Sequence, residues 1–161
     1  MTLIKPMSTA ADARAFKTLN LEWIDALFGV EPADLATLDH PEKIVAAGGQ
    51  VLVARDGEDI VGCVALVAEE PGVFEISKMA VTPRARGRGI GRLLLNAAVG
   101  YARLHGATTL FLASNARLTD AVHLYESVGF VHVPPAELRP IPYDRADVFM
   151  KFELQDRVPT A

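Results

Sequence analysis

The sequence has few features that would place the protein at a membrane, in an oxidising compartment or on a nucleic acid. Its one cysteine, Cys63, cannot form an internal disulfide, and the apolar residues around it predict a buried, unreactive thiol. No apolar run reaches the roughly 18 residues of a membrane span, and the first residues become polar too soon for a signal peptide. The formal net charge of -4 argues against nucleic-acid binding. We therefore expect a cytoplasmic protein with neither a membrane nor a nucleic-acid partner.

Two nucleotide-binding motifs and a zinc motif are also missing. The chain has no Gly-Lys-Ser/Thr, so the lysine and the magnesium ligand of a nucleoside-triphosphate P-loop are absent. A dinucleotide fingerprint is disfavoured, because Gly87-x-Gly89 is followed by Arg92 where the third glycine should stand. The four histidines share no spacing typical of zinc ligands, and we expect no metal site.

The length and the apolar pattern indicate one globular domain over residues 1–161. Half of the residues are hydrophobic (50%) and 22% are charged, which is enough apolar material for a sizeable core. Periodicity and turn residues predict an α/β (α+β) fold, with a mixed, mostly antiparallel sheet and helices on both faces. After a short first strand, we expect helices near 10–28, 33–38, 42–46, 89–105 and 118–128, and strands near 51–55, 60–68, 73–81, 108–113, 130–133 and 146–154.

The most informative stretch runs from Val81 to Arg92, where a strand ends, an arginine and glycine loop follows, and a helix begins. Its glycines, Gly87, Gly89 and Gly91, allow backbone amides to approach a ligand, and the helix start turns unpaired N–H groups toward it. Arginines at 84, 86, 88 and 92 add charge-assisted donors. The stretch predicts a site for a ligand with several phosphate charges. A basic turn without a ligand is the alternative.

Within this stretch, Arg86-Gly87-Arg88-Gly89-Ile90-Gly91 resembles the Gln/Arg-x-x-Gly-x-Gly/Ala pyrophosphate loop of the GNAT superfamily of acyl-CoA-dependent N-acyltransferases. The likeness is strongest from Phe74 to Phe130, where Asn115 and Leu124-Tyr125-x-x-x-Gly129-Phe130 stand at the family's spacing. Residues 16–24 and 142–147 resemble, more loosely, a bacterial subgroup of this superfamily whose acceptor substrate is unassigned. That subgroup usually has Leu-Glu-Ser-Asn at the position of Leu112-Ala113-Ser114-Asn115. Ala113 replaces the glutamate, so this chain has no carboxylate there.

The resemblance implies a GNAT-like fold and an enzyme that transfers the acetyl group of acetyl-CoA directly to the primary amine of a small molecule, in a ternary complex that leaves coenzyme A. In similar proteins the strand backbone pairs with the pantetheine arm and polarises the thioester, while loop amides hold the pyrophosphate. The cofactor-binding residues implied here are Met79, Ala80, Val81, Arg86, Gly87, Arg88, Gly89, Ile90, Gly91, Arg92, Asn115 and Tyr125.

Two side chains are the expected catalytic groups. The resemblance places Tyr125 near the thioester as the acid for the departing thiolate; a core tyrosine is the alternative. Glu75 is the best candidate for the general base, because strand alternation turns it away from Phe74 and Ile76; a solvated strand glutamate is the alternative. His123 is two residues before Tyr125 on the expected helix, so it should be an exposed histidine.

The acceptor side is less closely defined by the sequence. Arg145 and Asp147 would offer a basic and an acidic group to a zwitterionic molecule, and a loop salt bridge is the alternative. Asn115 is expected to contact pantetheine or acceptor, with a turn-forming asparagine as the alternative. Two alternative functions stay open: acetylation of protein amines, and a non-catalytic acyl-CoA binding or sensing module. The identity of the amine, the acyl chain length and the formation of a homodimer are also left open by the sequence. The expected acceptor contacts are Trp23, Asn115, Tyr143, Arg145 and Asp147.

Overall fold

A seven-stranded sheet forms the centre of the computed structural model, which describes residues 1–154. The last seven residues of the expected domain, 155–161, lie outside the described residues. The strand order is β1-β2-β3-β4-β5-β7-β6, and only the β4–β5 pair is parallel. The strands are β1 (Thr2–Pro6), β2 (Gln50–Asp56), β3 (Asp59–Glu70), β4 (Val73–Val81), β5 (Thr109–Ser114), β6 (Val131–His132) and β7 (Val148–Glu153).

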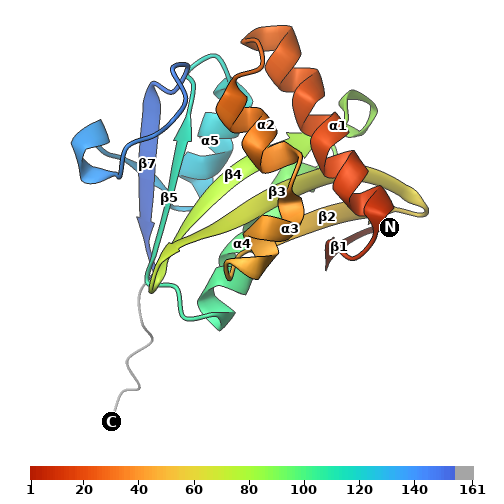
Figure 1. Ribbon diagram of the computed structural model, residues 1–161, viewed down its shortest axis with the longest axis horizontal. Helices are drawn as coiled ribbons and strands as arrows, with labels where there is room; N and C mark the ends of the chain where they lie inside the picture. Colours follow the sequence, from red (N-terminus) through yellow and green to blue (C-terminus); the bar gives the residue numbers. More distant parts are fainter. Residues whose placement is uncertain (155–161) are drawn as a thin grey trace.

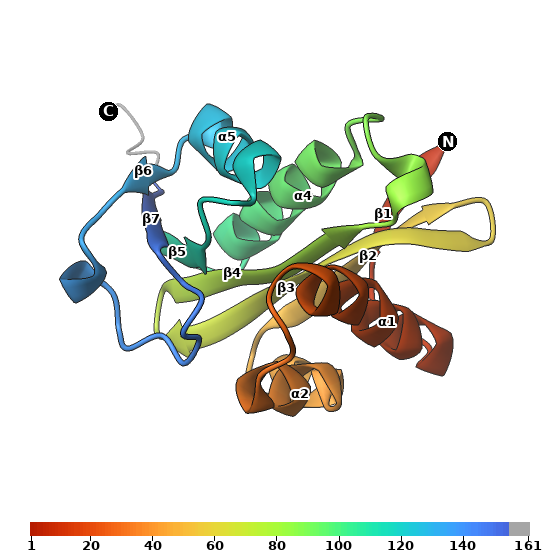
Figure 2. The ribbon, with the colours of Figure 1, turned by 90° about the horizontal axis from the view of Figure 1, so that it is seen from above.

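Helices cover both faces of this sheet (Figure 2). On one face lie α1 (Ala10–Leu27), α2 (Pro32–Leu38) and α3 (Pro41–Ala46), and on the other lie α4 (Ile90–Leu104) and α5 (Thr119–Val128). Two short 3-10 turns, Pro83–Ala85 and Pro135–Glu137, complete the assignment. The predicted fold class is confirmed. The strand limits differ by a few residues: β3 is three residues longer than the expected 60–68, β7 is three residues shorter than the expected 146–154, and β6 has two residues where we expected four.

Each face has its own apolar core, because the sheet separates the two helical layers. The larger core joins α4 and the sheet through residues such as Leu94, Leu95 and Leu110, which are fully buried. The smaller core joins α1 to the sheet through Phe16 and Ile24, also fully buried. Burial of this apolar area is the main force that holds the helices on the sheet. None of the helices among residues 1–154 has the length and apolar character of a membrane span.

The parallel pair β4–β5 is short, and this shapes the site. The two strands pair only at Val73 with Thr109, Phe74 with Leu110 and Glu75 with Phe111. Beyond that point β4 stays with β3 and β5 stays with β7, so the two halves of the sheet diverge (Figure 1). The backbone of β4 from 76 to 81 therefore has a strand neighbour on one side only.

A β-bulge lies in the same part of β4. Cys63 pairs with Ala80 and Ala65 pairs with Ser77, so β4 has one more residue than β3 over this stretch. Lys78 in the bulge has φ 53°, and it is the one non-glycine residue of the described chain in the left-handed region. Such a conformation costs on the order of 1–3 kcal/mol and persists only where surrounding contacts hold it.

Candidate active site

A cavity of about 650 Å³ opens where β4 and β5 diverge. Its walls come from both faces of the sheet, since α4 and α5 supply Ile90, Gly91 and Tyr125 while α1 supplies Trp23 and Leu27. This volume is in the usual range of small-molecule sites, about 300–1,000 Å³. The cavity therefore takes its lining from both faces of the sheet.

Most of the residues expected at the site meet in this cavity, although their roles stay predictions. Arg88, Arg92 and Asp147 do not line it. Arg88 pairs with Asp56 at 2.9 Å, and Arg92 donates to the Ser127 hydroxyl at 3.0 Å. The expected residues that do line the cavity are Trp23, Glu75, Met79, Ala80, Val81, Arg86, Gly87, Gly89, Ile90, Gly91, Asn115, Tyr125, Tyr143 and Arg145.

Asp147 lies away from the cavity because it holds a loop together. Its Oδ1 accepts a hydrogen bond from the Ala116 amide at 2.9 Å, and its own amide donates to the Ser114 carbonyl at 3.0 Å. Arg145 is paired elsewhere, with Asp34 and Glu31. The expected acid and base pair for a zwitterionic acceptor is thus not assembled by these two side chains.

The glycine loop gives the cavity an anion-binding end. Gly87 and Gly89 have φ values of 79° and 77°, in the left-handed region that favours glycine, and Gly89 is the N-cap of α4. The first amides of this 15-residue helix have no intrahelical partner, so they and the positive end of the helix dipole are available to a negative ligand. Arg86 donates from Nε to the Val81 carbonyl at 3.3 Å, and its side chain stays exposed beside the loop.

Glu75 sits at the other end of the cavity, on the face covered by α2. Burial is the main cause that raises the pKa of its carboxyl, to about 7, and the nearby Glu69 carboxylate raises it further. Lys78 and Arg139 act in the opposite direction and lower it. At neutral pH this carboxyl is divided between its acid and base forms, so it is suited to accept a proton.

Tyr125 lies in the wall formed by α5. The side chain is 8% exposed, and burial raises the pKa of its hydroxyl to about 12. A phenol with this pKa keeps its proton at neutral pH and can donate it. Glu75 and Tyr125 both line this cavity, and their roles as proton acceptor and proton donor stay predictions.

Asn115 has a clear structural task in the turn after β5. Its Nδ2 donates to the Arg145 carbonyl at 2.7 Å, and its Oδ1 accepts from the Arg117 amide at 2.8 Å. Both polar ends of the amide are engaged with backbone, as expected of a turn-forming asparagine. The side chain also lines the cavity, so contact with a ligand stays a prediction.

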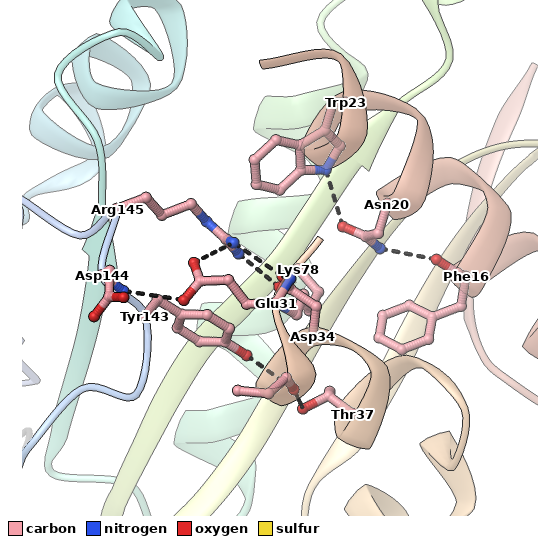
Figure 3. Close-up of polar contacts among 11 residues, drawn as sticks. Phe16, Asn20, Trp23, Glu31, Asp34, Thr37, Lys78, Tyr143, Asp144 and Arg145 are labelled. Carbon is pink, nitrogen blue, oxygen red and sulfur yellow. Dashed lines mark hydrogen bonds and ion pairs between the residues drawn. The ribbon is translucent and has the colours of Figure 1, made fainter. Parts of the chain in front are cut away.

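A buried ionic cluster borders the cavity at Lys78 and Arg145, and sequence reasoning missed most of it (Figure 3). The Asp34 carboxylate, fully buried on α2, accepts from Lys78 Nζ at 2.6 Å and from Arg145 Nη2 at 2.6 Å. Glu31 accepts from Arg145 Nη1 at 3.0 Å. Burial alone would raise the pKa of Asp34, but the hydrogen bonds from Arg145 and Lys78 hold it well below its ordinary value. The cluster joins α2, the bulge of β4 and the loop before β7.

Comparison with known proteins relates this architecture to acetyltransferases. The sequence profile of the acetyltransferase (GNAT) family matches residues 16–130. The chain is 36% identical over 103 residues to the IAA acetyltransferase of Azospirillum brasilense, covering 63% of each chain, and so spans less than two thirds of that relative. It is 30% identical over 128 residues to the uncharacterized N-acetyltransferase YjgM of Escherichia coli K12, covering 76% of each.

A solved structure has the same fold at low identity. The protein yncA of Salmonella typhimurium, solved with its cofactor acetyl-CoA, superimposes with a TM-score of 0.74 and 20% identity, over 100% of this chain and 98% of that one. Identity at this level supports the fold and not a shared substrate.

Proposed function

The chain belongs to the acetyltransferase (GNAT) family, and on this premise we propose that it transfers the acetyl group of acetyl-CoA to a primary amine of a small molecule, by direct transfer in a ternary complex. The observation that carries the proposal is one cavity that has the start of α4, with its free amides, on one face of the sheet and the Glu75 carboxyl on the other. The anionic cofactor and the amine then meet in the gap between β4 and β5.

Acetyl-CoA binds, in this proposal, along the diverging edge of β4. The amides at the start of α4 hold its pyrophosphate, and the edge of β4 between 79 and 81 that has no β5 neighbour pairs with the pantetheine arm. Glu75, directly or through a water, removes a proton from the amine, which then attacks the thioester carbonyl. The carbon–sulfur bond breaks, Tyr125 gives its proton to the departing thiolate, and the second proton that the amine nitrogen loses restores the Tyr125 hydroxyl through solvent. The products are the N-acetyl amine and coenzyme A.

A small acceptor is favoured over a protein amine by the ionic cluster. Arg145 joins the loop before β7 to α2 through Asp34 and Glu31, so the acceptor end is bridged by side chains that are at most 25% exposed. A polypeptide chain would have to separate these charges to lie across the site. Separation of a buried ion pair is costly, because each charge loses its partner in a poorly solvated place.

The first test is binding of acetyl-CoA without an acceptor. At a concentration one hundred times the dissociation constant, a ligand adds about 2.7 kcal/mol of stability, which for a chain of this length raises the melting temperature by roughly 5 to 11 °C. ATP and NAD should give much smaller shifts in the same differential scanning experiment. Equal shifts from all three ligands would leave only a general anion site and contradict the proposal.

A second test addresses the loop. The Gly89→Val variant should bind acetyl-CoA at least tenfold more weakly, because a β-branched residue at φ 77° strains the turn that aims the α4 amides. No atom lies within 4 Å of the added Cβ, so the effect comes from the backbone and not from a clash with the protein. The Arg84→Ala variant is the control, since the Arg84 side chain is 64% exposed and its ion pair is with Asp59, at 3.6 Å. Calorimetry on folded variants in which Arg84→Ala lost more affinity would show that the loop register is wrong.

A further inference from the structure

A second cavity, of about 320 Å³, adjoins the candidate active site. It lies between α2, the strands β3 to β5 and the proline-rich loop before β7. Three residues, Glu75, Ser77 and Tyr143, line both cavities. The carboxyl proposed as the base therefore stands where the two cavities meet.

Tyr143 forms a fixed wall between the two cavities. Its ring lies 4.2 Å from Lys78 Nζ and 4.6 Å from the Arg145 guanidinium carbon, and both cations are held by Asp34 (Figure 3). Its hydroxyl points to the Ala33 carbonyl on α2, at 3.5 Å. Cation–π contacts of this kind are strongest where water is excluded, as it is around the buried Lys78. The division into two cavities is thus built into the ionic cluster.

The two cavities differ in their charged side chains. The large cavity is lined by the basic residues Lys78, Arg86, Arg117 and Arg145 and by the acidic residues Glu75 and Asp120. Because Lys78 and Arg145 are paired with Asp34 and Glu31, its cations outside the ionic cluster are Arg86 and Arg117, and Arg86 lies beside the glycine loop, where an anionic cofactor would bind.

In the small cavity, the charged side chains of the lining are Glu69, Glu75 and Arg139. Glu69 and Arg139 form an ion pair, so the uncompensated group is the Glu75 carboxyl at the junction. The rest of the wall is mainly apolar, and includes Ala33, Ala36, Val67, Phe111, Ile141 and Pro142.

We propose that the small cavity binds the uncharged, apolar arm of the acceptor, with its primary amine at Glu75, so that each substrate has its own cavity. This inference rests on the function proposed above and names the class of acceptor. The cavity holds about ten water volumes of roughly 30 Å³ each, enough for a short arylalkyl or alkyl chain. A carboxylate beside the amine would meet the Glu75 carboxylate, so an amine without a carboxylate is preferred to an amino acid.

The test compares three acceptors by thiol release from acetyl-CoA. We expect kcat/KM for 2-phenylethylamine to exceed that for ethylamine by tenfold or more, because each buried methylene is worth about 10-fold to 200-fold in discrimination. Phenylalanine, which adds a carboxylate to the same arm, should be at least tenfold poorer than 2-phenylethylamine.

Two variants and a matched control connect this preference to the small cavity. Ala36→Trp fills the cavity from α2 and Ile141→Trp fills it from the opposite loop, so each should lower kcat/KM for 2-phenylethylamine at least tenfold. Ethylamine should change by no more than about twofold. Leu35→Trp adds the same side chain at a neighbouring α2 position that is 40% exposed and does not line the cavity, and it should change neither acceptor.

The outcomes separate this inference from the proposed function. If ethylamine and 2-phenylethylamine react equally well, or if the two cavity-filling variants slow both amines alike, the small cavity does not bind the arm, and the transferase proposal still stands. If no amine is acetylated although acetyl-CoA raises the melting temperature, the transferase proposal fails and this inference fails with it.

Discussion

Replacement of Glu75 by glutamine should lower kcat/KM for a primary amine by about two to four orders of magnitude near pH 7, the usual range for loss of a general base. An alkylamine of pKa about 10.4 is unprotonated in only about one molecule in 2,500 at pH 7, a deficit worth roughly 4.6 kcal/mol. Removal of that proton is therefore the larger obstacle to reaction. With the base absent, the rate should recover steeply toward pH 9 to 10, where solvent supplies the free amine.

The pH profile of the unaltered enzyme follows from the same carboxyl. Burial raises the pKa of Glu75 to about 7, so the basic form, and with it kcat/KM, should increase with pH through about 7. That acidic limb should disappear in Glu75→Gln. A Glu75→Gln profile parallel to that of the unaltered enzyme would remove Glu75 from the mechanism.

Tyr125→Phe is the matched control for this experiment. A thiol of pKa about 8.5 leaves tolerably well as the thiolate, so loss of the proton donor should cost a factor near the low end of the range, about a hundredfold. Because the missing group is an acid, higher pH should not restore the rate. Recovery of Tyr125→Phe at pH 9 to 10 would show that Tyr125 is not the proton donor.

The parts of the site that could be predicted from sequence are those encoded by neighbouring residues. The loop from 86 to 91 carries its own signal, because its glycines and the helix that follows fix the direction of the amides locally. Thr9 and Asp12 predict the start of α1, and their capping hydrogen bond of 3.1 Å is present. The parallel direction of β4 and β5 follows from the helical crossover through α4 that connects them.

The ionic cluster could not be predicted in the same way, because its members are far apart in the chain. Lys78 and Arg145 are 44 and 111 residues from Asp34, and no local pattern distinguishes them from surface charges. The left-handed backbone in the bulge is at Lys78 and not at a glycine, so the sequence does not predict it. For this reason we expected Arg145 to work with Asp147, its near neighbour, whereas the fold pairs it with α2.

Truncation of Asp34 to alanine should be among the most destabilising single changes on the α2 side of the sheet. Removal of one partner from a buried ion pair typically costs 3–5 kcal/mol, because the other charge stays buried without compensation. Here two cations, Lys78 and Arg145, lose their shared carboxylate, and the Glu31 amide loses a 2.9 Å hydrogen bond at the start of α2. For a chain of this length we expect the melting temperature to fall by about 6 to 20 °C.

The control and the pH dependence identify the cause of that loss. Asp59→Ala removes a carboxylate that is 65% exposed and lies 3.6 Å from Arg84, so its effect should stay below about 1 kcal/mol. The folded-state pKa of Asp34 is lowered, so its contribution is complete above the unfolded value of 3.8 and is lost as the pH falls below it toward the folded value. The difference in melting temperature between the unaltered protein and Asp34→Ala should therefore be constant from pH 5 to 8 and shrink below about pH 4. A loss no greater than that of Asp59→Ala would show that the cluster does not hold α2 to β4 and the loop before β7.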